Sequence, residues 1–244
     1  MASQGLSVKN ALVTGGSRGI GRATCIAFAE QGCSIAFSYN KNVRAARETE
    51  NAVKALGVKC VSVKADASSA ADCGRLVKAA VKAFQGIDFL VNNAGVEVVK
   101  PFRENSVEEI DSVIDTNLKG MLYITREALP FLSSNGVIVN VSSGLGKHAS
   151  ANVASYCASK FGGIGFTKSI AQELTQKCYA VCPGGVDTDM YRNDFHGSAG
   201  LKPEQIAQTI AYLCSPSCRE PSGKSIEVYS FKDVSNYVRK KVFG

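Results

Sequence analysis

A tyrosine and a lysine lie four residues apart in the segment Tyr156-Cys157-Ala158-Ser159-Lys160. If the segment is helical, both side chains lie on one face of the helix. A phenol with its ordinary pKa of ~10 is a poor base at neutral pH, but a nearby ammonium favours the phenolate and lowers that pKa. The pair could then exchange a proton with a substrate oxygen. Because this spacing is common, an exposed helical pair without a chemical role is the alternative.

Further polar residues lie where neighbouring elements are expected to end. Ser142 and Ser143 close an expected buried strand, and Asn92-Asn93-Ala94-Gly95 closes another. Parallel sheets present catalytic groups at the carboxyl ends of their strands. Asn117 lies inside a long expected helix, where an amide side chain needs a reason, although it could simply bond the backbone. These positions predict one polar site at one edge of a sheet.

A glycine-rich loop follows the first expected strand. It reads Thr14-Gly15-Gly16-Ser17-Arg18-Gly19-Ile20-Gly21 and opens a helix. Glycine allows positive φ angles and a close approach of the backbone to a ligand. The start of the helix offers free N–H groups and a positive dipole end to a pyrophosphate. The loop therefore predicts a dinucleotide site, and an ordinary glycine-rich turn is the weaker interpretation.

The end of the second expected strand bears on the choice of cofactor. It ends at Tyr39-Asn40-Lys41, and residues 33–47 contain no carboxylate to bind a ribose hydroxyl. Arg18, Lys41 and Arg44 lie nearby in the sequence instead. Guanidinium and ammonium groups bind a 2′-phosphate that an acid would repel. This pattern favours NADP(H), and the alternative is that Lys41 and Arg44 are solvated residues at a helix start.

Short apolar runs alternate with longer helical patterns along the whole chain. This alternation predicts parallel βαβ units and a single doubly wound Rossmann domain of the α/β class. We expect about seven parallel strands with helices on both faces. The expected strands are 11–13, 34–39, 59–64, 89–92, 137–142, 179–182 and 225–229, and the expected helices are 20–31, 43–56, 70–84, 107–132 (with an interruption near Pro130), 154–174 and 203–213.

Composition limits the classes of partner. The chain has 244 residues and a formal net charge of +7, without a block of basic residues, so phosphates or acidic carriers are the expected anionic partners and nucleic acid is not. No apolar run approaches the ~20 residues of a membrane span, and the N-terminus has no signal-peptide pattern, so we expect a cytoplasmic protein without a membrane partner. Nine cysteines without a C-x-x-C pair predict reduced thiols, and His148 and His196 lack the spacing of metal ligands.

These motifs together resemble the short-chain dehydrogenase/reductase family, in its NADP-dependent 3-oxoacyl carrier-protein reductase-like branch. They appear in the family's order between residues 9 and 190, so an accidental match is improbable. The matching features are Thr14-Gly15-x-x-x-Gly19-x-Gly21, Asp66, Asn92-Asn93-Ala94-Gly95, Asn117, Ser143, Tyr156-x-x-x-Lys160 and Pro183-Gly184.

The resemblance implies catalytic roles. Tyr156 would give a proton to the carbonyl while the nicotinamide delivers hydride, and Ser143 would hydrogen-bond that oxygen. Lys160 would lower the tyrosine pKa and hold the nicotinamide ribose, while Asn117 would position a water in a proton relay. We choose Ser143 over Ser142 because its interval to Tyr156 is the family's. Ser142 would then point to the other face of its strand.

The resemblance also implies the cofactor contacts. Asp66 would accept from the adenine amine, Asn93 would line the adenosine ribose, and Thr188 would contact the carboxamide. Asp66 could instead be a helix cap, and Thr188 a turn residue. The full expected set is Gly15, Ser17, Arg18, Gly19, Ile20, Gly21, Tyr39, Asn40, Lys41, Asp66, Ala67, Asn93, Ala94, Gly95, Tyr156, Lys160, Pro183, Gly184, Val186 and Thr188.

The chain departs from the family pattern in four places. Residues 174–181 are shorter than usual, and so is the substrate lid, expected at about 188–202. The positions where basic residues usually dock an acidic carrier hold Ser133-Ser134-Asn135 and Gln176-Lys177, which weakens the carrier-protein interpretation. Tyr229-Ser230 replaces the family's final glycine pair. Candidate walls for the substrate are Asp189, Met190, Tyr191 and Phe195.

Three functions follow as hypotheses. The first is a reductase of 3-oxoacyl thioesters, carrier-bound or free, or of a related carbonyl. The second is a dehydrogenase of a sugar, polyol or small alcohol, since one fold hosts both chemistries. The third is a regulatory protein that binds NADP(H) without turnover, which would not need the whole set Asn117, Ser143, Tyr156 and Lys160. The family also implies a homodimer or homotetramer through helices 107–132 and 154–174.

Overall fold

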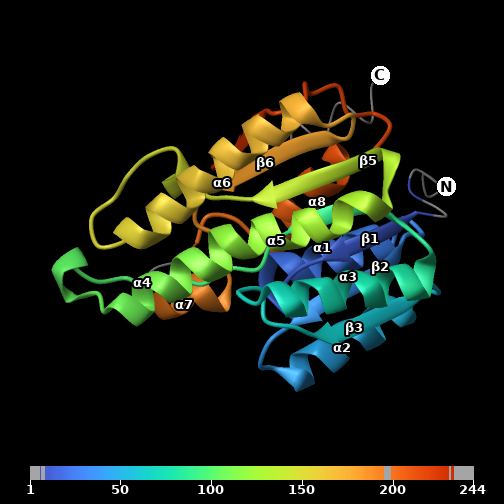
Figure 1. The fold of residues 1–244 in the computed structure, drawn as a ribbon, viewed down its shortest axis with the longest axis horizontal. Coiled ribbons are helices and arrows are strands. Elements are labelled where there is room, and N and C mark those ends of the chain that lie inside the picture. Colours follow the sequence, from blue (N-terminus) through green and yellow to red (C-terminus); the bar gives the residue numbers. More distant parts are fainter. Residues whose placement is uncertain (1–5, 7–8, 195–198, 231, 234–244) are drawn as a thin grey trace.

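The computed structural model describes residues 6, 9–194, 199–230 and 232–233. Their strands form one parallel sheet in the order β3-β2-β1-β4-β5-β6-β7, which confirms the expected doubly wound fold (Figure 1). The strands are β1 (Asn10–Val13), β2 (Ser34–Tyr39), β3 (Cys60–Lys64), β4 (Ile87–Asn92), β5 (Leu132–Val141), β6 (Lys177–Pro183) and β7 (Ser225–Val228).

Helices cover both faces of the sheet because successive strand residues point to opposite sides. In β1, Ala11 and Val13 belong to one buried apolar cluster and Leu12 to another. The first cluster includes residues of α1 (Gly19–Ala29), α2 (Val43–Lys54) and α8 (Pro203–Leu213). The second includes residues of α3 (Ala70–Phe84), α5 (Gly120–Ala128) and α6 (Ala154–Glu173). Strands buried on both faces explain the continuous apolar runs in the sequence.

The long helix expected over residues 107–132 is divided, and it ends early. It consists of α4 (Val107–Ile114), a π-helical segment (Asp115–Lys119), α5 and a 3₁₀ turn (Leu129–Phe131), and Leu132 already belongs to β5. The α-helix does stop near Pro130, as expected, and an unexpected π-helical segment interrupts it at Asn117. The side chain of Asn117 bonds the backbone of Val96, and a π segment is a common way to turn one side chain toward a functional site.

The shortened region near residue 174 is absorbed by an early strand. Helix α6 ends at Glu173, one residue before expectation, and β6 begins at Lys177 instead of residue 179. Lys177 pairs with Val137 in β5, so the hydrogen-bonded ladder between β5 and β6 begins at these two residues. Strand β5 likewise begins at Leu132 and ends at Val141, which leaves Ser142 just beyond it. A short helix, α7 (Asp189–Asp194), was not expected.

The other ends match the expected residues or differ from them by one or two, a difference that is usual for the ends of elements. The N-terminal caps explain why several starts were predicted well. Ser69 accepts from the backbone N–H of Asp72 at α3, and Ser106 forms a capping box with Glu109 at α4. Pro203 is the first residue of α8, as expected.

Candidate functional site

A cleft of about 1260 Å³ runs along the carboxyl edge of the sheet, on the side toward which α4 and α7 project in Figure 1. All but two of the expected site residues line it, and the two that do not are Gly21 and Asn117. The lining set is Gly15, Ser17, Arg18, Gly19, Ile20, Tyr39, Asn40, Lys41, Asp66, Ala67, Asn93, Ala94, Gly95, Ser143, Tyr156, Lys160, Pro183, Gly184, Val186 and Thr188.

The glycine-rich loop has the backbone that its sequence predicts. Gly15 and Gly19 have φ angles of 66° and 53°, a region that favours glycine. Gly21 does not line the cleft. A Cβ at this position would lie 2.2 Å from the carbonyl oxygen of Gly15, so only glycine fits there. Gly21 therefore allows the tight turn, while the loop at the start of α1 is open to a pyrophosphate.

The loop is tied to the end of β4. The hydroxyl of Thr14 accepts from the backbone N–H groups of Asn93 and Ala94 at 2.9 and 3.0 Å. The side-chain amide of Asn93 donates to the carbonyl oxygens of Thr14 and Gly15 at 2.9 and 3.2 Å. Asn93 thus holds the two halves of the cleft in register while it lines the expected ribose position.

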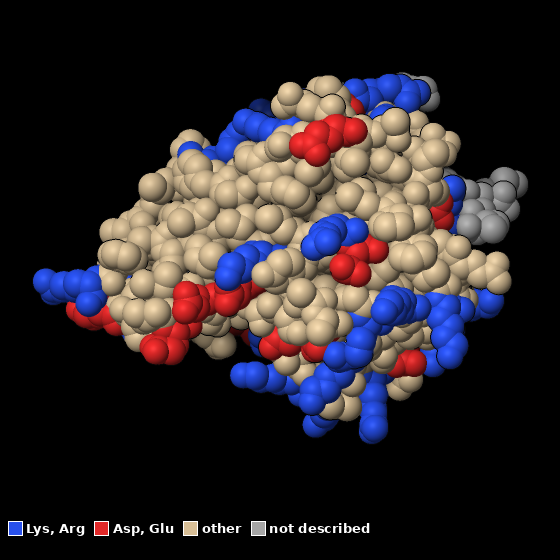
Figure 2. All heavy atoms as spheres, in the orientation of Figure 1, with Lys and Arg blue, Asp and Glu red and all other residues tan. Residues whose placement is uncertain are grey.

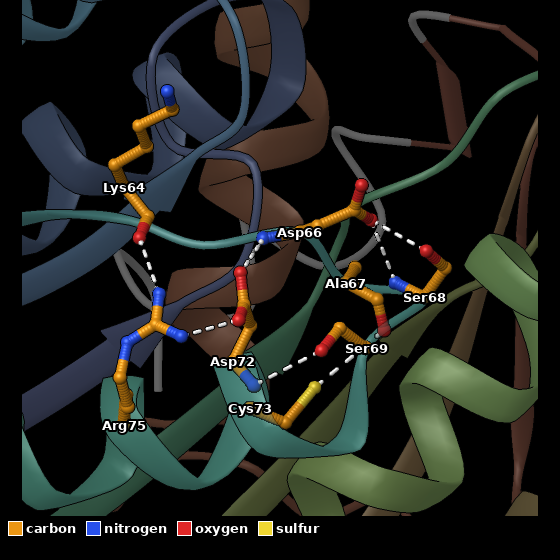
Figure 3. Close-up of polar contacts among 8 residues, drawn as sticks. All are labelled: Lys64, Asp66, Ala67, Ser68, Ser69, Asp72, Cys73 and Arg75. Carbon is orange, nitrogen blue, oxygen red and sulfur yellow. Dashed lines mark hydrogen bonds and ion pairs between the residues drawn. The ribbon is translucent and has the colours of Figure 1, made fainter.

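Asp66 stands at the far end of the cleft, and Figure 3 shows how its loop is fixed. One carboxylate oxygen accepts from the backbone and hydroxyl of Ser68 at 2.9 and 2.7 Å, and the other accepts from the amide of Asn40 at 3.0 Å. The bond from the Ser68 hydroxyl is the largest influence that lowers the pKa of Asp66. Ser69, not Asp66, caps α3, so the helix-cap interpretation of Asp66 is wrong.

The three basic residues near the expected 2′-phosphate have different surroundings. Arg18 and Lys41 line the cleft, and Arg18 lies 3.8 Å from Asp189 of α7. Arg44 is 92% exposed, pairs with Glu48 at 3.1 Å and is not part of the cleft lining. Lys41 therefore lies where it could bind a 2′-phosphate, whereas Arg44 is a solvated residue near the start of α2.

Ser143 and Tyr156 are brought together at the base of the cleft. Both residues line the cleft, and the Ser143 hydroxyl is close enough to the phenol to lower the pKa of Tyr156 against the larger effect of burial. Ser143 also accepts from the backbone N–H of Leu145 at 3.1 Å, which fixes its side chain. The hydroxyl of Ser142 donates instead to the carbonyl oxygen of Lys160 at 2.9 Å. Both serines line the cleft, and Ser143 is the one whose hydroxyl acts on the pKa of Tyr156.

Burial changes the proton chemistry of the tyrosine–lysine pair. It raises the pKa of Tyr156 well above the ordinary value, and the charge of Glu97 adds to this effect. The expected lowering by Lys160 does not prevail, although the Lys160 ammonium lies 5.4 Å from the centre of the phenol ring. Burial lowers the pKa of Lys160 to about 8, while Glu97 acts in the opposite direction. Tyr156 is thus held as a neutral phenol, which is a proton donor.

Asn117 and Lys160 lie behind this pair. The Asn117 amide donates to the carbonyl oxygen of Val96 at 2.8 Å and to the Ser159 hydroxyl at 3.1 Å, and its oxygen accepts from the Val96 N–H at 2.8 Å. Lys160, which is 4% exposed, donates to the carbonyl oxygen of Val141 at 2.9 Å. A Cβ at Gly95 would lie 3.2 Å from the Asn117 oxygen and 3.6 Å from the Lys160 nitrogen. Asn117 does bond the backbone, and it also adjoins the lysine.

The cleft contains residues that sequence reasoning did not select. Glu97 follows Asn-Asn-Ala-Gly by two positions and is close enough to influence Tyr156 electrostatically. Tyr229 follows β7 directly, where the departure from the family pattern was a usable signal. Of the candidate substrate walls, Asp189, Met190 and Tyr191 line the cleft, and Phe195 lies outside the described residues. Thr188 accepts from the N–H of Tyr191, so it lines the cleft and also shapes a turn.

The described part of the chain also bears on metal binding and on membrane insertion. There, no three or more histidine, cysteine or acidic residues gather in a group able to hold a metal ion. No helix among the same residues is long and apolar enough to cross a membrane. All nine cysteines are buried and free of disulfides.

The fold and the site together define a class of protein, and comparison with known proteins identifies it. The family profile described as short chain dehydrogenase matches residues 9–199. This match covers most of the chain, so the protein belongs to the short-chain dehydrogenase/reductase family, as the motifs indicated.

The curated relatives include a 3-oxoacyl-[acyl-carrier-protein] reductase FabG from Staphylococcus aureus strain Mu50. It is 34% identical over 236 residues, which cover 90% of this chain and 96% of that protein. A hydroxynaphthalene reductase-like protein Arp2 from Metarhizium robertsii is 35% identical over 218 residues, covering 86% of this chain and 82% of that protein.

Solved structures show the same fold. A short-chain dehydrogenase from Burkholderia cenocepacia J2315 in complex with NADP has a TM-score of 0.87 and 29% identity, covering 92% of this chain and 97% of that chain. A blue fluorescent protein from a metagenomic library in complex with NADPH has a TM-score of 0.88 and 29% identity, with coverage of 93% and 98%.

Proposed function

We propose that the protein is an NADP(H)-dependent carbonyl reductase. When bound, NADPH would supply the hydride that the carbonyl carbon takes up, and a proton from the protein would pass to the carbonyl oxygen. The products are a secondary alcohol and NADP⁺. The observation that carries the proposal is that Ser143, Tyr156 and Lys160 line one open cleft, with the Lys160 nitrogen 5.4 Å from the centre of the Tyr156 ring.

NADP(H) is the cofactor that this cleft binds. The loop at Gly15 and Gly19 leaves the backbone bare beside the start of α1, which suits a pyrophosphate. Lys41 supplies positive charge just after β2, where an acidic residue would favour NAD, and Arg18 supplies it at the start of α1. Solved relatives of the same fold hold NADP or NADPH.

The proton path uses residues of this chain in series. Tyr156 gives its proton to the carbonyl oxygen, and Ser143 orients that oxygen through a hydrogen bond. Lys160 lies beside Tyr156 with a pKa of about 8, so near neutral pH its ammonium can help restore the proton. Asn117 positions the far end of the relay from the π segment, where it bonds Val96 and Ser159.

A 3-oxoacyl thioester is the first candidate substrate. The staphylococcal relative is a reductase of such carrier-bound compounds, and its similarity spans most of this chain. An acidic carrier is a less suitable partner, because the usual docking positions hold Ser133 and Gln176, whose amide donates to the Ser133 carbonyl at 3.3 Å. A free thioester would not need that docking charge.

A ring-bearing ketone is a second candidate, and a specific observation favours it. Two tyrosines, Tyr191 and Tyr229, line the cleft beyond the catalytic serine. The relative from Metarhizium is a hydroxynaphthalene reductase-like protein, a name that refers to a flat aromatic substrate.

The enzyme would consist of a single domain, in which the segment 188–202, with α7, serves as the lid over the substrate. The free cysteines suit a cytoplasmic location.

The test is NADPH and NADH oxidation in parallel over an acetoacetyl thioester, a diketone, a keto-sugar and an aromatic ketone. We expect turnover of at least one ketone, with NADPH preferred. Equal or better use of NADH would contradict the cofactor assignment. Tight NADPH binding with no turnover of any member would favour the non-catalytic hypothesis instead.

A further inference from the structure

Tyr229 is fixed at the carboxyl edge of the sheet. It follows β7 directly, and its backbone N–H and that of Ser230 donate to one carboxylate oxygen of Asp233 at 2.9 and 2.8 Å. The side chain is 41% exposed and lines the same cleft as Ser143 and Tyr156. A large aromatic side chain that stays half exposed in a cleft has one face available to a ligand.

The ring of Tyr229 packs against two glycines. A Cβ at Gly144 would lie 3.0 Å from Cε1 of Tyr229, and a Cβ at Gly184 would lie 3.5 Å from Cδ1. Gly144 directly follows Ser143, and Gly184 directly follows β6. The ring therefore spans the ends of two strands and lies immediately beside the serine that would hold the carbonyl oxygen.

The hydroxyl end of Tyr229 lies near a charged group. The carboxylate of Glu227, two residues earlier in the chain, is one of the influences that raise the pKa of Tyr229. Glu227 pairs in turn with Lys147 at 2.9 Å, in the segment that follows Ser143. Burial is the main influence that raises the pKa of Tyr229 to about 12, so the ring remains a neutral wall at physiological pH.

A second ring faces the cleft close by. A Cβ at Gly185 would lie 2.9 Å from Cε2 of Tyr191, which belongs to α7. Consecutive glycines at 184 and 185 thus leave room for one tyrosine ring each. Both rings line the cleft.

We propose that Tyr229 is a specificity-determining residue whose fixed ring, together with Tyr191, selects a ketone carried on a flat ring system over one carried on a flexible acyl chain. Aromatic faces gain about 0.5–1.5 kcal/mol from stacking on another ring, a factor of about two to ten in affinity. An acyl chain gains no stacking and loses conformational freedom against a rigid wall. This inference rests on the proposed function, because it concerns the substrate of the same site.

The experiment measures binding and turnover separately. Calorimetry with the NADP⁺-loaded protein would follow 2-naphthol, a flat alcohol that needs no reaction to bind. NADPH oxidation would follow 2-tetralone and the acetoacetyl thioester of N-acetylcysteamine. The variants are Tyr229→Leu, which removes the ring, and Tyr229→Phe, which keeps it. Phe131→Leu is the matched control, because Phe131 is an exposed aromatic residue outside the cleft lining.

We expect Tyr229→Leu to weaken 2-naphthol binding about three- to tenfold and to raise KM for 2-tetralone by a similar factor, with kcat and the thioester KM little changed. Tyr229→Phe should stay within about twofold of the original protein, as should Phe131→Leu. Equal naphthol affinity in the original protein and Tyr229→Leu, or no naphthol binding at all, would overturn the inference. Naphthol binding that depends on the ring, without reduction of any ketone, would support the aromatic site and refute the proposed reductase.

Discussion

Individual side chains decide the chemistry proposed for this site. Tyr156 needs its proton to act as the acid, and burial keeps that proton in place. Lys160 is equally buried, and its lowered pKa of about 8 brings its titration close to physiological pH. Sequence reasoning found both residues from their spacing. It expected a lowered pKa for Tyr156, whereas the pKa is raised. Burial causes this difference, and burial depends on packing that residue spacing does not describe.

Glu97 should set the pH range of the proposed carbonyl reduction. Its negative charge raises the pKa of both Tyr156 and Lys160, so Glu97→Gln should lower both values. Reduction needs both groups protonated, so its rate should fall as pH rises through the lower pKa, that of Lys160. In Glu97→Gln this falling limb should move to lower pH. Rate profiles from pH 6 to about 10 would measure the shift, with Glu204→Gln on α8 as the control, and an unmoved limb would argue against this role.

Lys41 should contribute to the choice of NADPH over NADH. It lines the cleft at the end of β2, whereas Arg44 pairs with Glu48 outside the lining. Loss of a charged contact to phosphate costs about 1.5 kcal/mol or more, so Lys41→Ala should weaken NADPH binding about tenfold and leave NADH binding nearly unchanged. Fluorescence titration of both cofactors measures this. Arg44→Ala is the matched control, and an equal effect from both variants would contradict the assignment.

At the scale of elements, local patterns predicted most of the architecture. Apolar runs such as β4, buried along its whole length, indicated the strands, and Pro203 indicated the start of α8. The π segment at Asn117 was not predictable, because it depends on bonds to Val96, distant in sequence. Tyr229 was missed as a cleft residue for the same reason, since its neighbours Gly144 and Gly184 come from other strands.

Gly21 tests how the glycine-rich loop works as an element. A Cβ there would lie 2.2 Å from the Gly15 carbonyl oxygen, so Gly21→Ala should distort the loop and weaken NADPH binding at least tenfold. Far-ultraviolet circular dichroism should remain close to that of the original protein. Gly74→Ala in α3 is the control, because its Cβ would lie 3.5 Å from the flexible end of Glu127. Undiminished NADPH binding in Gly21→Ala would show that the turn tolerates a side chain.

At the scale of the whole molecule, the distribution of charged and apolar residues over the surface shows where another protein chain could bind. Figure 2 shows Lys and Arg gathered mostly over the α2 and α3 side, while the face over α5 and α6 carries few charges. Leu122 of α5 and Phe161 of α6 are 38% and 44% exposed. These two residues give each helix one apolar side chain that a second protein chain could cover.

We expect these two helices to form the interface of a homodimer or homotetramer. Light scattering should give a mass at least twice that of one chain, and Phe161→Glu should lower it, because a buried charge without a partner is unfavourable. Val43→Glu, which changes an exposed apolar residue on α2, is the control. A monomer mass for the original protein would refute the interface.

The role of Tyr156 is the central claim, and Tyr156→Phe tests it most directly. The measurement is NADPH oxidation with the best ketone of the panel, alongside NADPH affinity of the same variant. We predict a loss of kcat of about 10²–10⁴-fold with NADPH affinity within a few-fold of the original, because the change removes only the proton donor. A Tyr156→Phe variant that reduces the ketone at the original rate would contradict the account.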